Sequence, residues 1–286
     1  MSAVRALGER SVQDALVSPE RPDMEVALAA AQAGADVVRN AYGRQSTRHA
    51  KSDSDFATDA DLGAERAILG VIKSARPGDT RVGEESGSTG TSSTRQWLVD
   101  PLCGTLNFAA QTPLVAVNVA LLDEEAGTIA SVSADPIAHE FFWADSDGAF
   151  LRRHGSDEAL TPSTQSRLVD INCDGPIDRP FLGPQLMADP AFRAAFGPRV
   201  MSTTLAVAWV AAGRRSGYVS DGLFVENVHY AAGIALCRRA GCVVTDLAGE
   251  PLEDGRGLII AADVETHRRL VDIIRPHLAD VLGRSN

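Results

Sequence analysis

The sequence predicts a layered α/β or α+β fold. Segments with apolar residues at helical spacing alternate with short apolar segments typical of strands, most regularly in the second half of the chain. The 286 residues suit one large domain or two closely packed halves, and they are enough to bury a substantial core. The sequence contains no internal repeat and no low-complexity tract, so a repetitive architecture is not expected.

The first half is predicted to begin with two helices. After an N-terminal extension over residues 1–22, residues 24–43 have apolar side chains at helical spacing and end on Gly43, which suits a C-cap. Residues 44–56 are polar and predict a loop. Residues 59–75 predict a second amphipathic helix, because acidic residues occupy its first turn, where the helix dipole favours them.

The remaining elements divide the chain into an N-terminal α+β half, residues 23–155, and a C-terminal α/β half, residues 156–286. In the first half, a flexible connector is expected at residues 88–95, strands at residues 80–86, 96–102, 114–123 and 127–136, and a hairpin at residues 140–155. In the second half, strands are expected at residues 167–172, 216–220, 242–249 and 258–263. Helices are expected there at residues 202–213, with hydroxyl caps, and at residues 228–241 and 264–278.

Charge and cysteine content restrict the function classes. A formal net charge of −11 disfavours nucleic acid and anionic membranes as partners, although a bound cation would still allow a small anionic substrate. The four cysteines form no CxxC pair, which argues against a disulfide framework and a structural zinc site. No apolar run is long enough to cross a bilayer and the N-terminus lacks the features of a signal peptide, so we expect a cytoplasmic protein.

Acidic and polar residues gather at three places near the ends of predicted elements. The groups are Lys51 with Asp55, Asp59 and Asp61, then Glu84 with Glu85, then Asp100 with Cys103 and Thr105. In the third group, Pro101 fixes the backbone after Asp100 and Gly104 lets the chain bend sharply. The turn can then present a carboxylate, a carbonyl and a side chain to one cation, and the amides of the next helix to a phosphate. Taken alone, the motif also fits an ordinary strand-turn-helix joint.

Together these motifs resemble the inositol monophosphatase superfamily of magnesium-dependent, lithium-sensitive phosphomonoesterases. The resemblance begins near residue 24 and rests on DFATDAD, GEES, WLVDPLCGTLNF, the GAF hairpin, AVAWVAAG followed by GY, and AAGIALCRRAGCVVTDLAGEPL. It implies a layered αβαβα sandwich in two halves, a Mg²⁺ cofactor, a small phosphate monoester as the substrate, and a homodimer.

The resemblance also assigns metal-binding roles position by position. Glu84 matches a glutamate that binds the first metal and helps to orient the attacking water. Asp100 matches an aspartate shared between two metals, and Leu102 matches a residue that contributes its backbone carbonyl. Asp61 matches an aspartate near the metal cluster.

The same comparison implies residues at the substrate. Thr105 matches a threonine whose hydroxyl helps to position water, and Lys51 is retained. We therefore expect Gly104, Thr105 and Lys51 at the substrate phosphate. The acidic residue that contacts the substrate in the family has no clear match, and Asp221 and Glu226 both stay open for that position.

Two ligand positions depart from the family pattern. The family has an aspartate where this chain has Cys103. The family also has W-D-x-A-A-G where this chain has VHYAAG, so Val228 replaces a tryptophan and His229 replaces an aspartate. Both replaced aspartates bind the second metal, whereas the ligands of the first metal remain.

In one account of these departures, the protein still binds metals and hydrolyses phosphate esters. Asp100, Cys103 and His229 then form an oxygen, sulfur and nitrogen set that suits Zn²⁺ or Mn²⁺. Glu84, Asp100 and the Leu102 carbonyl hold a hard ion such as Mg²⁺. The metal polarises the phosphoryl oxygens and generates hydroxide.

Two other accounts compete with the metal account. In one, no second metal binds, and Cys103, His229 and Asp100 act as nucleophile, base and orienting group in acyl transfer or thioester hydrolysis. In the other, the protein has no catalytic activity and binds a ligand or a partner. The paired substitution favours a thiol mechanism. The retained Glu84 and Thr105 have no duty in a thiol mechanism, and for this reason we favour the metal account.

Overall fold

The computed structural model describes residues 22–51, 56–175, 181–222, 224, 227–252 and 256–282. The predicted N-terminal extension lies outside these residues except for Pro22, and Asp55 and Glu226 also lie outside them. None of the helices in the described part of the chain combines the length and the apolar character that a bilayer crossing needs.

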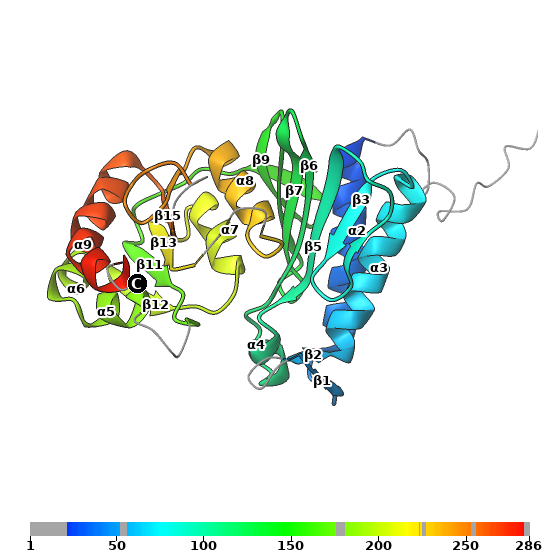
Figure 1. The fold of residues 1–286 in the computed structure, drawn as a ribbon, viewed down its shortest axis with the longest axis horizontal. Helices are drawn as coiled ribbons and strands as arrows, with labels where there is room; N and C mark the ends of the chain where they lie inside the picture. The colour runs from blue at the N-terminus through cyan, green and yellow to red at the C-terminus, as the bar shows by residue number, and fades with distance from the viewer. Residues whose placement is uncertain are drawn as a thin grey trace, which may run out of the picture.

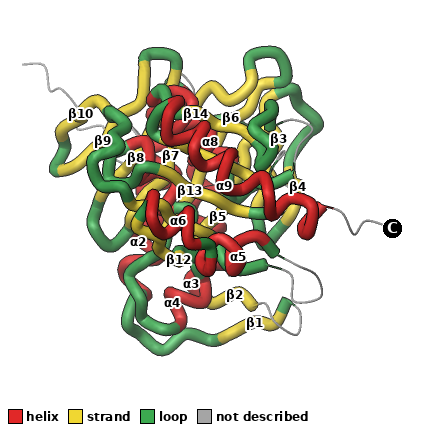
Figure 2. Tube along the Cα trace, turned by 90° about the vertical axis from the view of Figure 1, so that its left-hand side faces the viewer, coloured by secondary structure: helices red, strands yellow, loops and turns green. Residues whose placement is uncertain are grey.

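Helices and sheets alternate in five layers, as the αβαβα sandwich predicted (Figure 1). Two helices cover the outer face of a large sheet, two lie between this sheet and a smaller one, and three cover the outer face of the smaller sheet. In this order they are α2 (Asp23–Ala41) and α3 (Asp59–Ala75), α7 (Leu205–Ala211) and α8 (Ala231–Ala240), and α5 (Leu182–Ala188), α6 (Pro190–Ala195) and α9 (Val264–Leu282). A short helix, α4 (Thr105–Ala109), lies at one end of the molecule beside the strands β1 (Arg48–Ala50) and β2 (Phe56–Thr58) (Figure 2).

The large sheet has eight strands in the order β10-β9-β8-β7-β6-β5-β3-β4. Their bounds are β3 (Thr80–Gly83), β4 (Gly87–Thr89), β5 (Arg95–Cys103), β6 (Ala116–Asp123), β7 (Gly127–Asp135), β8 (Glu140–Asp145), β9 (Gly148–Arg153) and β10 (Ser156–Ala159). β3 runs parallel to β5, and the other neighbours are antiparallel. Because β10 pairs with β9, the first sheet continues past the boundary expected at residue 155.

The small sheet has five strands in the order β12-β11-β13-β15-β14. Their bounds are β11 (Leu168–Ile171), β12 (Gly197–Val200), β13 (Gly217–Ser220), β14 (Val243–Thr245) and β15 (Leu258–Ala261). β11 pairs in parallel with both β12 and β13, whereas β15 is antiparallel to β13 and β14. The central strand β13 is buried along its whole length, as expected for a strand covered on both faces of its sheet.

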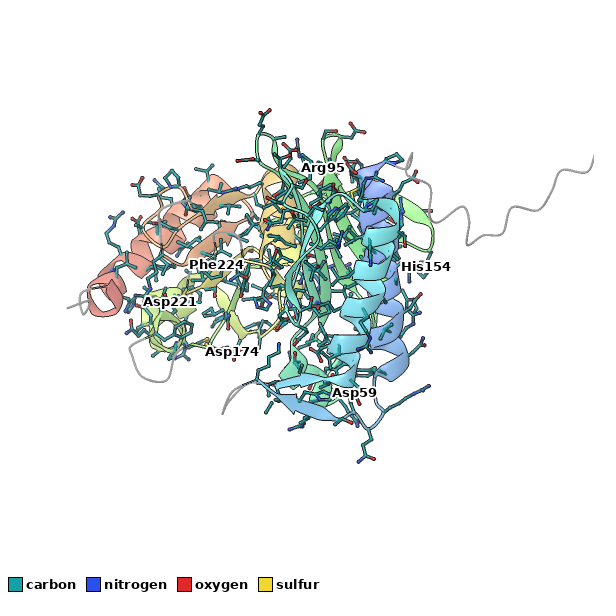
Figure 3. The ribbon with its side chains drawn as sticks, turned by 45° about the vertical axis from the view of Figure 1, so that its right-hand side comes forward. Asp59, Arg95, His154, Asp174, Asp221 and Phe224 are labelled. Carbon is teal, nitrogen blue, oxygen red and sulfur yellow. The ribbon has the colours of Figure 1, made fainter. Side chains whose placement is uncertain are left out.

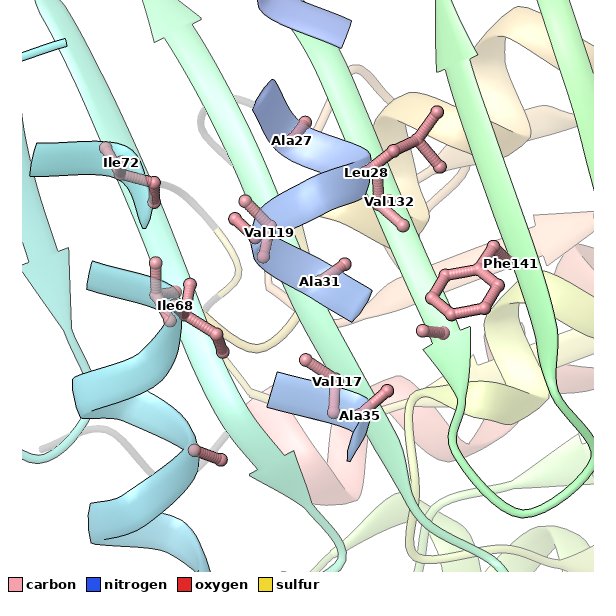
Figure 4. Packing of buried hydrophobic residues seen from close by; sticks show 14 of the residues in the cluster. Ala27, Leu28, Ala31, Ala35, Ile68, Ile72, Val117, Val119, Val132 and Phe141 are labelled. Carbon is pink, nitrogen blue, oxygen red and sulfur yellow. The ribbon is translucent and has the colours of Figure 1, made fainter. Parts of the chain in front are cut away.

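The core of the N-terminal half lies between the helix pair and the large sheet (Figure 4). Small side chains along α2, such as Ala27 and Ala31, are fully buried against the sheet. A Cβ atom at Gly34 would lie 2.6 Å from the Cδ1 atom of Ile68 in α3, so the glycine lets the two helices approach closely. This packing holds α3 firmly, and the first turn of α3 carries a residue of the site.

The structure also contains elements that the sequence did not predict. β1 lies within the expected loop at residues 44–56, and β4 lies at the start of the expected connector. All residues of β1 and β4 are exposed, so neither strand has the alternating apolar pattern that would have revealed it. Between residues 181 and 200, α5, α6 and β12 fill a stretch for which no element was expected.

Candidate active site

A sharp turn at the end of β5 forms the centre of the site. The pairing of β5 with β6 is irregular between Asp100 and Cys103, and the Leu102 amide donates a hydrogen bond to Asp100 Oδ1 at 3.2 Å. Gly104 follows with φ +99°, and a Cβ atom there would lie 2.9 Å from the Leu114 carbonyl oxygen. The turn therefore requires glycine at position 104, for both its backbone angle and its surroundings.

Three side chains from distant parts of the sequence meet at this turn. One ligand atom each of Glu84, Asp100 and His229 lies within 4.8 Å of the others. Glu84 directly follows β3, and its amide donates to the Val99 carbonyl at 3.1 Å, because β3 and β5 run parallel. His229 precedes α8, and its Nδ1 lies 2.9 Å from Asp100 Oδ2. We call these three residues the metal-ligand group, since carboxylate oxygens and an imidazole nitrogen form a common ligand set.

The environment of the metal-ligand group shifts its proton affinities. Burial, followed by the charge of Asp100, raises the pKa of Glu84 to about 8. Burial lowers the pKa of His229, but the Asp100 charge, the hydrogen bond to Asp100 and the Glu84 charge together outweigh it and raise that pKa to about 9. Without a cation, the group therefore retains protons at neutral pH that it would release in water.

The two carboxylate oxygens of Glu84 have different surroundings. The Lys51 ammonium lies 2.9 Å from Glu84 Oε1 and 2.6 Å from Glu85 Oε1. Glu84 Oε2 is buried and has no hydrogen-bond partner among the described residues. A buried, unpaired carboxylate oxygen is costly in a folded protein, so this atom is a natural ligand for a cation.

Asp61 and Thr105 form a separate, hydrogen-bonded pair. Asp61 is fully buried and accepts hydrogen bonds from the Thr58 amide at 2.8 Å, the Thr58 hydroxyl at 2.5 Å and the Thr105 hydroxyl at 2.9 Å. Burial raises the pKa of Asp61, and these hydrogen bonds oppose that rise. Asp61 thus lies outside the metal-ligand group and instead fixes Thr105, which begins α4. Thr58 was not singled out from the sequence, although it is the central threonine of DFATDAD.

Cys103 is not brought into the metal-ligand group. Its sulfur accepts a hydrogen bond from the Thr204 amide at 3.2 Å, and its side chain packs with Leu114 against the core of the C-terminal half. Burial and the nearby Asp100 charge raise the pKa of the Cys103 thiol well above its usual value, despite the hydrogen bonds from Thr204. The thiol is therefore neutral near physiological pH, and among the described residues its hydrogen-bond partner is Thr204, not His229.

A buried polar chain behind Asp100 was missed in the sequence. Asn118 in β6 donates to Asp100 Oδ2 at 3.4 Å and to the Thr204 hydroxyl at 2.8 Å. Ser133 in β7 donates to Asn118 Oδ1 at 2.7 Å. A single asparagine within the apolar strand AVNVALL was the available indication. Thr204 itself makes no capping bond to α7. The Leu205 amide donates to the Thr203 hydroxyl, so Thr203 provides the capping side chain.

The metal-ligand group opens into a cavity of about 460 Å³, which we call the active-site cavity. Both halves of the protein line it, with Glu84, Leu102, Cys103, Gly104, Thr105, Leu106, Asn172, Asp174, Ser202, Thr203, Thr204, His229 and Tyr230. The Tyr230 hydroxyl lies 2.8 Å from that of Tyr218 and accepts from the Asn172 side chain at 3.2 Å. Asn172 and Asp174 were not predicted, although Asn172 ends a predicted strand, where binding residues often lie.

The other acidic candidates lie elsewhere. Asp221 is paired with Arg256 at 2.8 Å and does not appear in the described lining of the active-site cavity. Figure 3 shows Asp221 in the C-terminal half and Asp59 at the far end of the N-terminal half. Asp59 accepts from His49 at 2.8 Å and from the Thr47 amide at 3.1 Å. Asp55 and Glu226 lie outside the described residues.

The layered fold and its acidic site define a hydrolase of the phosphoric monoester class. The model of the Inositol monophosphatase family matches residues 20–279, and the chain belongs to this family. Family members generally depend on Mg²⁺ and act on small phosphate substrates.

Individual relatives agree with this assignment. The chain is 32% identical over 236 residues to an inositol-1-monophosphatase of Caulobacter vibrioides, covering 79% of this chain and 89% of the relative. It is 30% identical over 275 residues to the Nus factor SuhB of Pasteurella multocida, covering 91% and 98%. The crystal structure of SuhB from Bartonella henselae matches with a TM-score of 0.76 at 29% identity, covering 88% and 98%. An inositol monophosphatase of Thermotoga maritima matches in fold with a TM-score of 0.75 at 20% identity, covering 88% and 96%.

Proposed function

We propose that the protein hydrolyses a small phosphate monoester, such as a sugar, inositol or nucleotide phosphate, in a metal-dependent reaction. The observation that carries the proposal is the metal-ligand group of Glu84, Asp100 and His229 at the wall of the active-site cavity. A cavity of about 460 Å³ is within the range of small-molecule sites.

The residues present fit one divalent cation. Glu84 Oε2 is buried without a hydrogen-bond partner in the described structure, and Asp100 is fully buried, so both carboxylates gain a partner when a cation binds. The Leu102 carbonyl would add a third oxygen and His229 a nitrogen, a set that suits Mg²⁺, Mn²⁺ or Zn²⁺. When bound, such an ion polarises a phosphoryl oxygen and makes water a stronger nucleophile.

The protein's own residues would prepare the water and the phosphate. The Thr105 hydroxyl donates its proton to Asp61, so its oxygen lone pairs are left to accept a hydrogen bond from water. Glu84 would bind the cation through Oε2, because Lys51 holds Oε1 and Oε2 has no hydrogen-bond partner among the described residues. In this position Glu84 would help to orient the attacking water beside the cation.

The geometry favours the metal account over the thiol account. A nucleophilic cysteine needs a lowered pKa and a base within hydrogen-bond reach, whereas Cys103 has a raised pKa and accepts its bond from the Thr204 amide. The bond of His229 to Asp100 fits both accounts, but no hydrogen bond joins Cys103 to His229 among the described residues. The proposed metal site is atypical because His229 belongs to it. Cys103 does not belong to it and packs against the core.

Metal removal and reloading test the proposal. Protein stripped with a chelator should lose phosphatase activity on a panel of phosphate monoesters, and Mg²⁺, Mn²⁺ or Zn²⁺ should restore it. Glu84→Gln should lower kcat by about a hundredfold or more, because it removes a carboxylate that holds the cation and the charge that the cation needs. The neighbouring variant Glu85→Gln is the matched control and should lose much less, since Glu85 lies outside the metal-ligand group. Activity that persists in the chelator, or equal losses in the two variants, would overturn the proposal.

A further inference from the structure

Another cavity, of about 310 Å³, lies at the C-terminal end of α4. We call it the arginine cavity; it is lined by Arg44, Gln45, Ser46, Arg48, Thr58, Phe108, Ala109 and Gln111. Its walls come from the segment after α2, from the β1–β2 hairpin and from the end of α4, which lie together at one end of the molecule (Figure 2). The two cavities have no described lining residue in common, because Thr105 and Leu106 line the first whereas Phe108 and Ala109 line the second.

The arginine cavity is basic in a protein of net charge −11. Within the described residues, neither Arg44 nor Arg48 is paired with a carboxylate, and the described lining contains no acidic side chain. The Arg48 guanidinium instead stacks over the Phe56 ring, 4.6 Å from its centroid. By contrast, arginines such as Arg214 and Arg215 form close ion pairs with buried carboxylates.

Neutral donors accompany the two guanidinium groups. The Ser46 hydroxyl oxygen is buried and has no hydrogen-bond partner among the described residues. Gln45 and Gln111 also line the cavity, and the Tyr42 hydroxyl donates to the backbone carbonyl of Gln111 at 2.5 Å. A buried hydroxyl without a partner is unfavourable, and an acceptor placed in the cavity would satisfy it.

We propose that the arginine cavity is a second binding site, for the phosphate group of a small molecule or for free inorganic phosphate. Guanidinium groups bind phosphate oxygens through paired, charge-assisted hydrogen bonds, which a hydroxyl and two amides can supplement. The volume is at the lower end of small-molecule sites, so it accepts a phosphate with at most a small appended group. The site does not depend on a metal and goes beyond the proposed hydrolysis.

Calorimetric titration of the metal-stripped full chain with inorganic phosphate tests this binding. The arginine variants and the hydrogen-exchange map below distinguish this binding from binding in the active-site cavity, so the result is independent of whether the protein is a phosphatase. The wild type should bind one phosphate per chain, and Arg44→Gln with Arg48→Gln should weaken binding by about tenfold or more. The single variants Arg44→Gln and Arg48→Gln should each weaken binding, whereas Arg193→Gln, which removes one exposed arginine from α6, is the control for a single lost charge and should bind as the wild type does.

Ser46→Ala separates ligand binding from folding. This variant removes an unpaired buried hydroxyl, so its melting temperature should stay the same or rise while its phosphate affinity falls. Hydrogen exchange should show protection by phosphate at residues 44–48 and 108–111. Sugar or nucleotide phosphates that bind more tightly than phosphate would identify an esterified ligand, and equal affinity would identify the free anion. Absence of phosphate binding, an equal loss in Arg193→Gln, or protection confined to residues 202–204 and 229 would overturn the proposal.

Discussion

Protons and a metal ion should compete for the metal-ligand group. In the metal-free protein, the pKa of Glu84 is raised from 4.5 to about 8, and that of His229 from 6.5 to about 9. A raised pKa in the folded state means that the fold favours the protonated form, so the stabilisation is complete at low pH and is lost as pH rises. Both groups act in the same direction, so the metal-free protein should become less stable between about pH 5 and pH 9.

The affinity for the metal should rise as pH rises, whereas the stability of the metal-free protein falls. A ligand must lose its proton before it binds a metal, so release of one proton per ion changes the dissociation constant by about tenfold per pH unit below the pKa. For His229 alone, between pH 7 and its pKa of about 9, this amounts to about a hundredfold, or about 2.7 kcal/mol, and release of the Glu84 proton below its pKa of about 8 adds to the change. Because 38% of the His229 side chain is exposed, solvent screening makes these values upper limits.

Thermal unfolding with and without Mn²⁺, from pH 6 to pH 9, measures both effects. The melting temperature of the metal-free protein should fall as pH rises across this range. The difference in melting temperature between the Mn²⁺-bound and the metal-free protein should grow as pH rises. His229→Gln should flatten the pH dependence of the increase, whereas His154→Gln, which changes an exposed histidine far from the site, should leave it unchanged. A metal-induced increase that stays constant or shrinks as pH rises would refute the assignment of His229 as a ligand.

Four further outcomes are expected. Cys103→Ala should keep chelator-sensitive activity and lose about 1 kcal/mol of stability at most, whereas loss of activity with intact folding would support the thiol account. Cys103→Asp with His229→Asp should gain Mg²⁺ affinity by calorimetry and Mg²⁺-dependent hydrolysis, and the single changes should gain much less, since ligands of one ion are coupled. Gly104→Ala should cost about 2 kcal/mol in denaturant unfolding, because φ is +99° and the Leu114 carbonyl blocks a Cβ atom. Light scattering should give twice the chain mass of 30.2 kDa if the expected homodimer forms.

Local sequence predicted the parts of the site that depend on neighbouring residues. The Asp100 turn follows from proline and glycine at fixed positions, and the structure confirms its sharp bend at Gly104. The meeting of Glu84 and Asp100 follows from strand ends, because β3 and β5 are parallel neighbours. The direction of the Cys103 side chain could not be predicted in this way, because it depends on the Thr204 amide, which lies 101 residues further along the chain.

Features that depend on tertiary contacts, and strands that are exposed on both faces, could not be predicted from patterns in the sequence. Asn172 and Tyr230 come together because β11 lies next to β13 and Tyr230 contacts Tyr218 of β13, so their spacing carries no local indication. A loop was expected at β1 because the sequence there is polar. Every residue of β1 is exposed, which accounts for the polar sequence. Hydrophobic periodicity reports burial on one face, and it fails for a strand that is exposed on both faces.

The two departures from the family pattern change the charge of the site in different ways. Cys103 removes a carboxylate, and its neutral thiol is accommodated by the Thr204 amide and the core. His229 removes another carboxylate and adds a group that carries a positive charge when no metal is bound. What remains is two carboxylates, Glu84 and Asp100, whose combined charge balances one divalent cation. A second cation would be left without charge compensation in a buried site, at a high electrostatic cost. The same two substitutions therefore argue for a phosphatase that works with a single ion, and counting the ions bound per chain decides it.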